Sequence, residues 1–438
     1  MRITVLLVLV EFCWVFYAQG VMAARFVLPQ NGDTVVGHLQ LGEVRGSDTL
    51  PDVARRYNVG FNEIIRANPG MDAWMPNPEP DNGRLLGTGV SGSGMPGSGI
   101  SRSGDSSPDK SSPATPGAHT SGKNGVVLIP SVFILPPKPW EGIIVNLAEM
   151  RLYYFPPAKK NQPALVKTYP LAIGQDNLRT PMGVFHITDK IDKPSWTVPA
   201  SIVAEDGLSR YGHRRIVPGG DDENPLGEHA LMLDEPGYLI HGTNKPYSIG
   251  RRVSRGCLRM YPEDIDELFS EVARGTVVRI INERFKVGRR HGMVYVEAHY
   301  SNYVDGINDS ENFTALVSGV IAQAPQTTIT PRQWRRLNRI ASQYSGLPAP
   351  FISLRDAPDL RQQWYVRLRK SSDMAQSQPV EQLLQRLLLP YAKYHCSDSL
   401  PSCATVGPLE NRHFAEAAVE VLGAQWVADP AITSVPRR

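Results

Sequence analysis

The sequence HGTNKPYSIGRRVSRGCLRMYPED, from His241 to Asp264, places one histidine directly before a glycine and one cysteine directly after another. The two side chains stand sixteen positions apart (257 − 241) in a segment that is otherwise rich in turn-forming residues. Residues on one helical face recur every three or four positions, so this spacing does not suit a single helix. We therefore predict two strand ends that a loop brings together.

The residue types in this stretch suit nucleophilic acyl transfer. A cysteine attacks as its thiolate and needs a base or a positive charge beside it. His241 can act as the base for Cys257, and Arg255 and Arg259 supply permanent positive charge. Gly256 lets the backbone approach a substrate carbonyl, so that amide N–H groups near the cysteine can hold the oxyanion formed on attack.

Length and charge set the outer limits. With 438 residues the chain exceeds the size of one hydrophobic core, so two or three domains are expected. The formal net charge of +3 is small and gives no argument for binding nucleic acid.

The first 24 residues have the features of a secretory signal peptide. Arg2 is followed by an apolar run and then by the small residues of GVMAA. Glu11 interrupts the run, which is shorter than the ~20 apolar residues that span a bilayer. We expect cleavage after Ala23 or Ala24 and an exported mature protein.

Cysteine usage supports a working role for Cys257. Removal of the signal peptide leaves Cys257, Cys396 and Cys403, an odd number for an oxidising compartment. Cys396 and Cys403 are close enough in sequence for a local disulfide, which would leave Cys257 as a free thiol.

Residues 40–131 are predicted to form a small first module. A strand is followed by a cap at Ser47 or Asp48, two short helices and a closing strand at Val126 to Ser131. A Gly/Ser/Pro-rich insertion over residues 83–125 separates the second helix from that strand and has too few apolar residues to fold. The segments GSDTLPDVARRYNVGFNEIIRANP and VVLIPS resemble a LysM module, which implies binding to glycan strands containing N-acetylglucosamine.

Residues 141–282 are predicted to form a mainly β domain. Ile143 to Leu147 and Arg151 to Phe155 indicate a hairpin, and one helix begins at Pro262 and stops at Gly275. Residues 300–438 form a C-terminal extension that is predicted to be partly helical, with amphipathic helices in PRQWRRLNRIASQYSG and VEQLLQRLLLPYAKY. The sequence indicates no role for this extension.

The pattern from His241 to Met260 resembles the L,D-transpeptidase (YkuD-type) catalytic domain. The segments RTPMGVFHI (residues 179–187) and IIVNLAEMRLYYF resemble two further parts of the same family. The resemblance implies a YkuD-like β-sandwich with one helix after the cysteine. It also implies a periplasmic enzyme of the bacterial cell wall that carbapenems inhibit.

The family assigns roles residue by residue. Cys257 would be the nucleophile, His241 the base and Gly242 the residue whose carbonyl orients the histidine, while Ser254, Gly256 and Arg259 would shape the oxyanion and substrate surroundings. The cysteine would attack a peptidoglycan stem peptide after its third residue, release D-alanine and pass the acyl group to an amine, without metal or organic cofactor. Many members have histidine where this chain has Arg255, a departure that would bear on the acceptor.

Several alternatives remain open at this stage. The acyl acceptor can be a second stem peptide, a lysine of an outer-membrane lipoprotein, or water, which would make a carboxypeptidase or hydrolase. Besides the transpeptidase and the hydrolase, a third hypothesis is a non-catalytic peptidoglycan-binding protein. Cys257 with His213, His229 and His241 would suit zinc by residue type, but no close-spaced ligand pair supports such a site.

Overall fold

The computed structural model describes residues 24–74, 125–301, 309–355, 362–368, 384–387, 389, 391–394, 403–409, 411–422 and 431–436. Almost all of the predicted signal peptide and of the low-complexity insertion lies outside these residues, as does Cys396. Within the described ranges, no helix has both the length and the apolar character needed to cross a membrane.

A nine-stranded sheet dominates the structure and confirms the mainly β class. Its strands follow the order β1-β8-β7-β6-β17-β10-β13-β14-β16. Their bounds are β1 Ala24–Val27, β6 Gly142–Asn146, β7 Arg151–Phe155, β8 Leu165–Pro170, β10 Gly183–Asp192, β13 His229–Leu233, β14 Leu239–His241, β16 Leu258–Arg259 and β17 Val277–Ile281. The predicted hairpin is the antiparallel pair β6 and β7.

The sheet folds over at β10, which pairs with two different strands along its length. Residues 183–186 of β10 pair with β17, whereas the rest of the strand pairs with β13 after a register shift between Ile187 and Asp189. A strand that changes partner at a bulge turns the corner of a folded sheet. The two halves enclose one core, to which Val145 contributes from one side and Leu231 from the other.

Helix α4 (Pro262–Glu271) follows the cysteine strand, as predicted, with Pro262 at its first position. It buries Ile265 and Leu268 in the same core. The predicted stop at Gly275 is wrong, because the helix already ends at Val272 and Gly275 lies in the following turn.

A second helix in this region was not predicted. Helix α3 (Ala200–Asp206) lies in an insertion between β11 (Trp196–Thr197) and β12 (Ile216–Val217), with a 3₁₀ turn at Ser209–Tyr211. This insertion has its own small core, in which Trp196 packs edge-on against Tyr211 with ring centroids 5.1 Å apart.

The first module has the predicted order of strand, helix, helix and strand. Strand β3 (Gln40–Glu43) pairs antiparallel with β4 (Val126–Ile129), and α1 (Leu50–Arg56) and α2 (Phe61–Ala67) lie between them in the chain. The predicted cap is wrong by one or two positions. Thr49 caps α1, because its hydroxyl accepts from the Asp52 N–H while the Asp52 carboxylate accepts from the Thr49 N–H.

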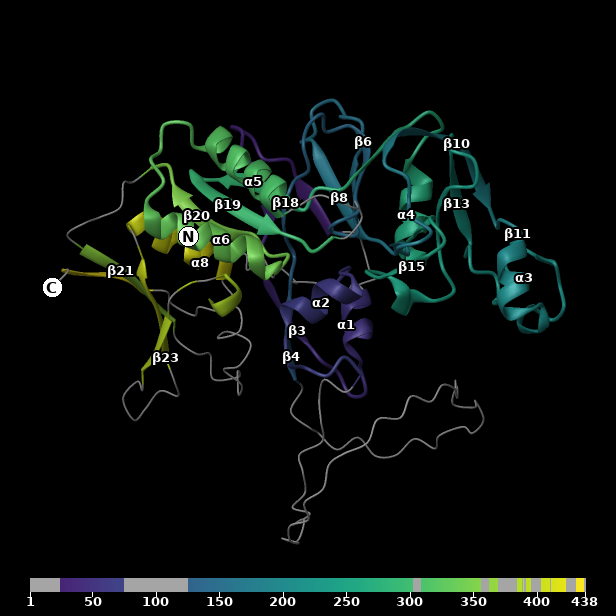
Figure 1. The fold of residues 1–438 in the computed structure, drawn as a ribbon, viewed down its shortest axis with the longest axis horizontal. Coiled ribbons are helices and arrows are strands. Elements are labelled where there is room, and N and C mark those ends of the chain that lie inside the picture. Colours follow the sequence, from purple (N-terminus) through teal and green to yellow (C-terminus); the bar gives the residue numbers. More distant parts are fainter. Residues whose placement is uncertain are drawn as a thin grey trace, which may run out of the picture.

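This module packs directly on the large sheet domain (Figure 1). The Phe61 N–H donates to the Ile249 carbonyl at 2.9 Å, and the backbones of Gly60 and Gly250 approach so closely that neither position has room for a side chain. Glu63 forms an ion pair with the fully buried Arg151 at 2.6 Å. The stretch between His241 and Cys257 therefore rests on α2 at Ile249 and Gly250.

The C-terminal region is a mixed α/β unit. Strands β18 (Phe285–Arg290), β19 (Met293–Ala298) and β20 (Ala349–Ser353) form one sheet. Strands β21 (Gln362–Leu368), β22 (Tyr391–Tyr394), β23 (Cys403–Leu409) and β24 (Ala431–Pro436) form another. The helices of this region are α5 (Asp309–Gln323), α6 (Pro331–Gln343) and α8 (Arg412–Leu422). Two short strand pairs lie outside the C-terminal region: β2 (Val35–Gly37) with β5 (Val132–Ile134), and β9 (Ile173–Gly174) with β15 (Arg252–Ser254).

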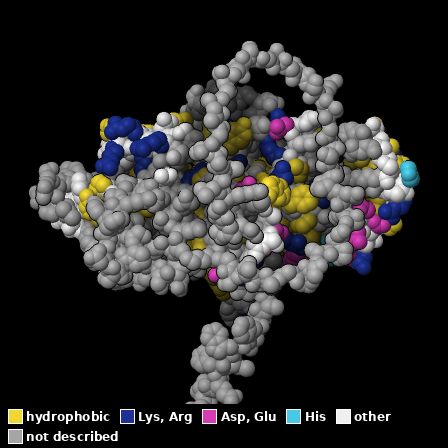
Figure 2. Space-filling model, turned by 90° about the horizontal axis from the view of Figure 1, so that it is seen from below, with side chains coloured by type: hydrophobic (Ala, Val, Ile, Leu, Met, Phe, Trp, Pro, Cys, Tyr) yellow, Lys and Arg dark blue, Asp and Glu magenta, His cyan; other side chains and the backbone are white. Residues whose placement is uncertain are grey.

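The predicted helix over VEQLLQRLLLPYAKY is wrong in its second half, where Tyr391–Tyr394 is strand β22. The C-terminal region shares a hydrophobic core with segments near the first module, since Leu39 and Ile134 cluster with Phe351 and Val406. Acidic, basic and hydrophobic side chains all appear on the described surface seen from below (Figure 2), which fits the small net charge.

Candidate active site

The ends of two neighbouring strands bring His241 and Cys257 to the same part of the sheet. Strands β14 and β16 are parallel, with His241 paired to Arg259 and Ile240 to Leu258. Cys257 directly precedes β16, so it lies one residue from the strand that pairs with the strand ending at His241. The Met260 N–H donates to the His241 carbonyl at 2.8 Å and fixes this register.

The ring of His241 is buried and held by backbone. Its Nδ1 lies 2.7 Å from the Gly242 carbonyl oxygen. A carbonyl only accepts, so Nδ1 carries the proton and Nε2 keeps a lone pair. The pKa of His241 is lowered to about 3, because burial and, to a smaller extent, the nearby charge of Arg259 outweigh the opposite effect of the Gly242 and Leu226 carbonyls. The imidazole is therefore neutral at physiological pH.

The thiol of Cys257 is only partly exposed and is neutral at rest. Burial raises its pKa, whereas the Leu239 N–H and the charge of Arg259 act to lower it. The Sγ donates to the Gly237 carbonyl at 3.5 Å. Among the contacts of the described residues, no hydrogen bond joins this thiol to His241, and the pKa shifts of the two groups leave both of them neutral at rest.

Ser254 and Gly256 shape the turn that carries the thiol. Ser254 is buried, and its hydroxyl donates to the Cys257 carbonyl and accepts from the Gly256 N–H at 3.2 Å. Gly256 has φ +110°, and an added Cβ would lie 2.7 Å from the Tyr238 ring. The Ser254 hydroxyl thus bonds the backbone of its own turn.

Arg259 is the positively charged residue that acts on both His241 and Cys257. Its Nε is buried without a hydrogen-bond partner among the described residues. Burial lowers the pKa of Arg259, while Cys257, Tyr247 and Tyr211 act to raise it. Sequence reasoning did not single out either tyrosine. Tyr247 lies within the stretch from His241 to Asp264. Tyr211 belongs to the α3 insertion, and no sequence pattern marked it.

Arg255, the departure from the family pattern, contacts that insertion. Its Nη1 donates to the Ser201 hydroxyl on α3 at 3.0 Å. The residue before the Gly–Cys pair therefore ties the nucleophile turn to the helix that sequence reasoning missed.

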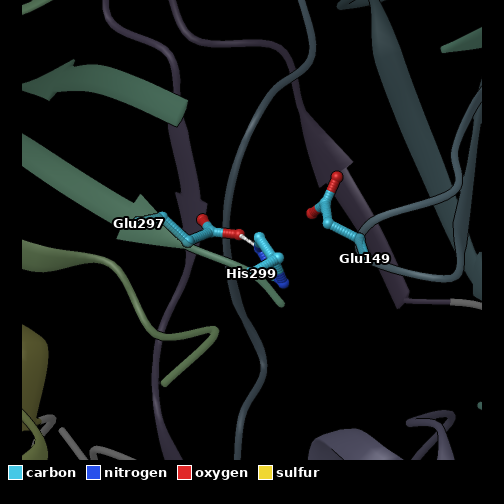
Figure 3. A group of neighbouring side chains, drawn as sticks. All are labelled: Glu149, Glu297 and His299. Carbon is cyan, nitrogen blue, oxygen red and sulfur yellow. Dashed lines mark hydrogen bonds and ion pairs between the residues drawn. The ribbon is translucent and has the colours of Figure 1, made fainter. Parts of the chain in front are cut away.

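The structure does not bring the alternative zinc ligands Cys257, His213, His229 and His241 together. Over the described residues, the cluster with metal-ligand geometry is instead Glu149, Glu297 and His299, whose ligand atoms lie within 4.8 Å of one another (Figure 3). All three side chains are buried. Lys286 already pairs with both carboxylates and thus supplies the positive charge that a metal would bring.

Replacement of Lys286 by methionine is expected to destabilise the fold by about 3–5 kcal/mol, because two buried carboxylates lose their partner. Burial alone would lower the pKa of Lys286, but the charges of Glu149 and Glu297 outweigh the effect of burial. The pKa of Lys286 is therefore raised, which agrees with a charged ammonium. Urea unfolding measures the effect. Exposed Lys159→Met is the control and should change stability by about 0.5 kcal/mol or less; an equal effect of both variants would contradict the assignment.

The fold and the site together define a mainly β domain in which a histidine ends one strand and a cysteine directly precedes the parallel strand beside it. The family model of the L,D-transpeptidase catalytic domain (YkuD) matches residues 141–280. The probable L,D-transpeptidase YcfS of Escherichia coli is 37% identical over 284 residues, which cover 63% of this chain and 73% of that protein. The chain belongs to the L,D-transpeptidase family.

Two further comparisons agree in name. The probable L,D-transpeptidase YbiS of Escherichia coli is 32% identical over 66% of this chain and 79% of its own. The solved catalytic domain of an E. faecium L,D-transpeptidase aligns with 32% of this chain and 96% of its own at 22% identity, with a TM-score of 0.24. Family membership rests on the sequence relatives alone.

Proposed function

We propose that this protein is a peptidoglycan L,D-transpeptidase in which Cys257 is the nucleophile and His241 the base. The observation that carries the assignment is the geometry of His241. Its Nδ1–H is committed to the Gly242 carbonyl at 2.7 Å, which leaves the Nε2 lone pair as the proton acceptor at the end of the strand that pairs with β16, the strand directly after Cys257.

In the first half-reaction, the Cys257 Sγ attacks the carbonyl carbon of the third stem-peptide residue as its proton moves to His241 Nε2. The carbonyl oxygen becomes an oxyanion, and its collapse breaks the bond to the terminal D-alanine. The leaving amine takes the proton back from His241. A thioester on Cys257 and a free D-alanine are the products.

In the second half-reaction, an amine attacks the thioester carbonyl and gives its proton to His241. The new amide forms as the Cys257 sulfur leaves and recovers a proton. The amine can belong to a second stem peptide or to a lipoprotein lysine, and water in its place would give hydrolysis. Arg255, which joins the nucleophile turn to α3, is placed to influence this choice.

The products separate these possibilities. Incubation with tetrapeptide-stem muropeptides should give cross-linked dimers and free D-alanine, measured by liquid chromatography and mass spectrometry. Tripeptide monomers alone would favour the hydrolase. A folded protein with reduced Cys257 that gives neither product would favour the non-catalytic binder and contradict the proposal.

We further propose that the LysM-like module of residues 40–131 binds the glycan strand, so that the catalytic region acts on peptides attached to the same polymer. Its strand, helix, helix, strand order supports this assignment. The full chain is expected to co-sediment with insoluble peptidoglycan stripped of its stem peptides. Sedimentation only with peptide-bearing material would contradict glycan binding.

We also propose that the protein acts in the periplasm after cleavage of its signal peptide behind Ala23 or Ala24. The features that support this location are the signal-like N-terminus and membership of a family that acts on the cell wall. N-terminal sequencing of the protein purified from its native envelope should begin at Ala24 or Arg25.

A further inference from the structure

The backbone on one side of Cys257 is held by a side chain that plays no part in the chemistry described so far. Thr180 lies in the turn before β10 and is 2% exposed. Its hydroxyl donates to the Gly256 carbonyl at 2.7 Å and accepts from the Gly174 N–H at 3.1 Å. A threonine distant in sequence thus bonds the peptide unit that joins Gly256 to Cys257.

This bond fixes the direction of the next N–H group. The Gly256–Cys257 peptide is trans, so its carbonyl and its N–H point to opposite sides of the peptide plane. Because the carbonyl is directed at Thr180, the Cys257 N–H is directed away from Thr180. Rotation of the plane would break the 2.7 Å bond before it could turn the N–H elsewhere.

The Cys257 N–H is the donor of this turn that remains open. The Gly256 N–H is already given to the Ser254 hydroxyl, and the Leu258 residue that follows is in the β14–β16 ladder. Over the described residues, the Cys257 N–H itself has no partner. An open backbone donor on the nucleophilic residue is a common component of an oxyanion site.

We propose that Thr180 is a positioning residue that aims the Cys257 N–H at the oxyanion formed during acyl transfer. The inference rests on the proposed function, in which Cys257 attacks a carbonyl. When sulfur adds to the carbonyl carbon, the C=O π electrons move to oxygen, and the Cys257 N–H donates a hydrogen bond to that oxyanion without losing its proton. The bond is released when the carbonyl re-forms and the amine leaves.

The chain of donors adds to this effect. The Gly174 N–H donates to the Thr180 oxygen, and the Thr180 hydroxyl donates to the Gly256 carbonyl. A peptide whose carbonyl accepts a hydrogen bond is a stronger donor at its own N–H, because successive hydrogen bonds polarise one another. The hydroxyl therefore contributes orientation and donor strength, which a methyl group at the same place does not.

Two reactions of the same thiol test the proposal. A carbapenem acylates Cys257 through an oxyanion, whereas iodoacetamide alkylates it by displacement without one. In the full mature chain, Thr180→Val is expected to slow carbapenem acylation by about 10- to 100-fold, and to leave the alkylation rate within about threefold of the parent, because displacement needs no oxyanion donor. Thr180→Ser, which keeps the hydroxyl, should restore most of the acylation rate.

Thr188→Val is the matched control, since the Thr188 hydroxyl bonds the Met232 carbonyl on β13, outside the nucleophile turn. Equal losses in acylation and alkylation for Thr180→Val would overturn the proposal, and so would no loss in either. Thr180→Ala is read in the same way if the valine variant does not fold. A parent that is not acylated at Cys257 at all would instead refute the proposed function.

Discussion

Replacing Cys257 with alanine is expected to reduce transpeptidation by roughly 10⁴-fold or more, because the residue supplies the bond-forming atom and nothing substitutes for it. The backbone should be unaffected, since the Cys257 carbonyl and its bond from Ser254 do not involve the sulfur. Dimer formation from tetrapeptide muropeptides measures the loss.

The control for this variant removes the other thiols. A chain with Cys396 and Cys403 both replaced by alanine should keep its transpeptidase activity, since neither lies in the sequence around the site. Residual activity of the Cys257→Ala protein above about one hundredth of the parent would show that another group is the nucleophile and would contradict the mechanism.

Replacing His241 with asparagine is expected to lower kcat/KM by about 10²- to 10⁴-fold, the usual effect of losing a general base. The asparagine amide can still donate to the Gly242 carbonyl, so the loss reports the missing proton acceptor. The exposed His186, which pairs with Asp234, provides the control variant His186→Asn and should retain activity.

The pH profile of the parent follows from the same residue. The base form of His241 is the neutral ring, and a pKa of about 3 keeps it neutral as pH falls from 7 to 5. An ordinary histidine, with a pKa of about 6.5, would lose most of its base form over that range. We expect kcat/KM to change little between pH 7 and pH 5. A drop that follows an inflection near pH 6.5 would contradict the buried neutral imidazole.

The sequence was sufficient for the parts of the fold that local chemistry decides. The β6–β7 hairpin, the start of α4 at Pro262 and the pairing of the strand ending at His241 with the strand after Cys257 all follow from turn residues, apolar runs and one loop. These features depend on neighbours within a few tens of residues. The family resemblance then assigned roles that fit the observed geometry of His241 and Gly242.

Other features depend on contacts between distant segments and left no local pattern. Strand β1 has four residues directly at and after the predicted cleavage site, where the sequence predicted no strand, yet it pairs with β8. The helix predicted over residues 380–394 has an apolar pattern, but pairing with β23 makes its last four residues a strand. Tyr211 reaches the site only through the fold, and no sequence pattern marked it. Thr180 lies in the segment RTPMGVFHI that resembles the family, but the sequence did not show that its hydroxyl bonds the Gly256 carbonyl.

The sequence also did not predict that the first module packs against the catalytic domain. The sequence predicted two modules without predicting a contact between them, but the Asn58 amide donates to the Asp264 carboxylate, and the Tyr261 hydroxyl donates to the Val59 carbonyl. Such contacts are made by single polar groups on turns, which have no periodicity for a sequence pattern to detect. The catalytic region is therefore braced by residues far outside 141–282.

Formation of a thioester on Cys257 can be observed by intact-protein mass spectrometry of the mature chain after incubation with a tetrapeptide-stem muropeptide, followed by peptide mapping. The thioacyl mechanism predicts an adduct with the mass of the acyl donor less D-alanine, attached to Cys257 and absent from the Cys257→Ala protein. An adduct on any other residue, or cross-linked dimers formed equally by the Cys257→Ala protein, would contradict it.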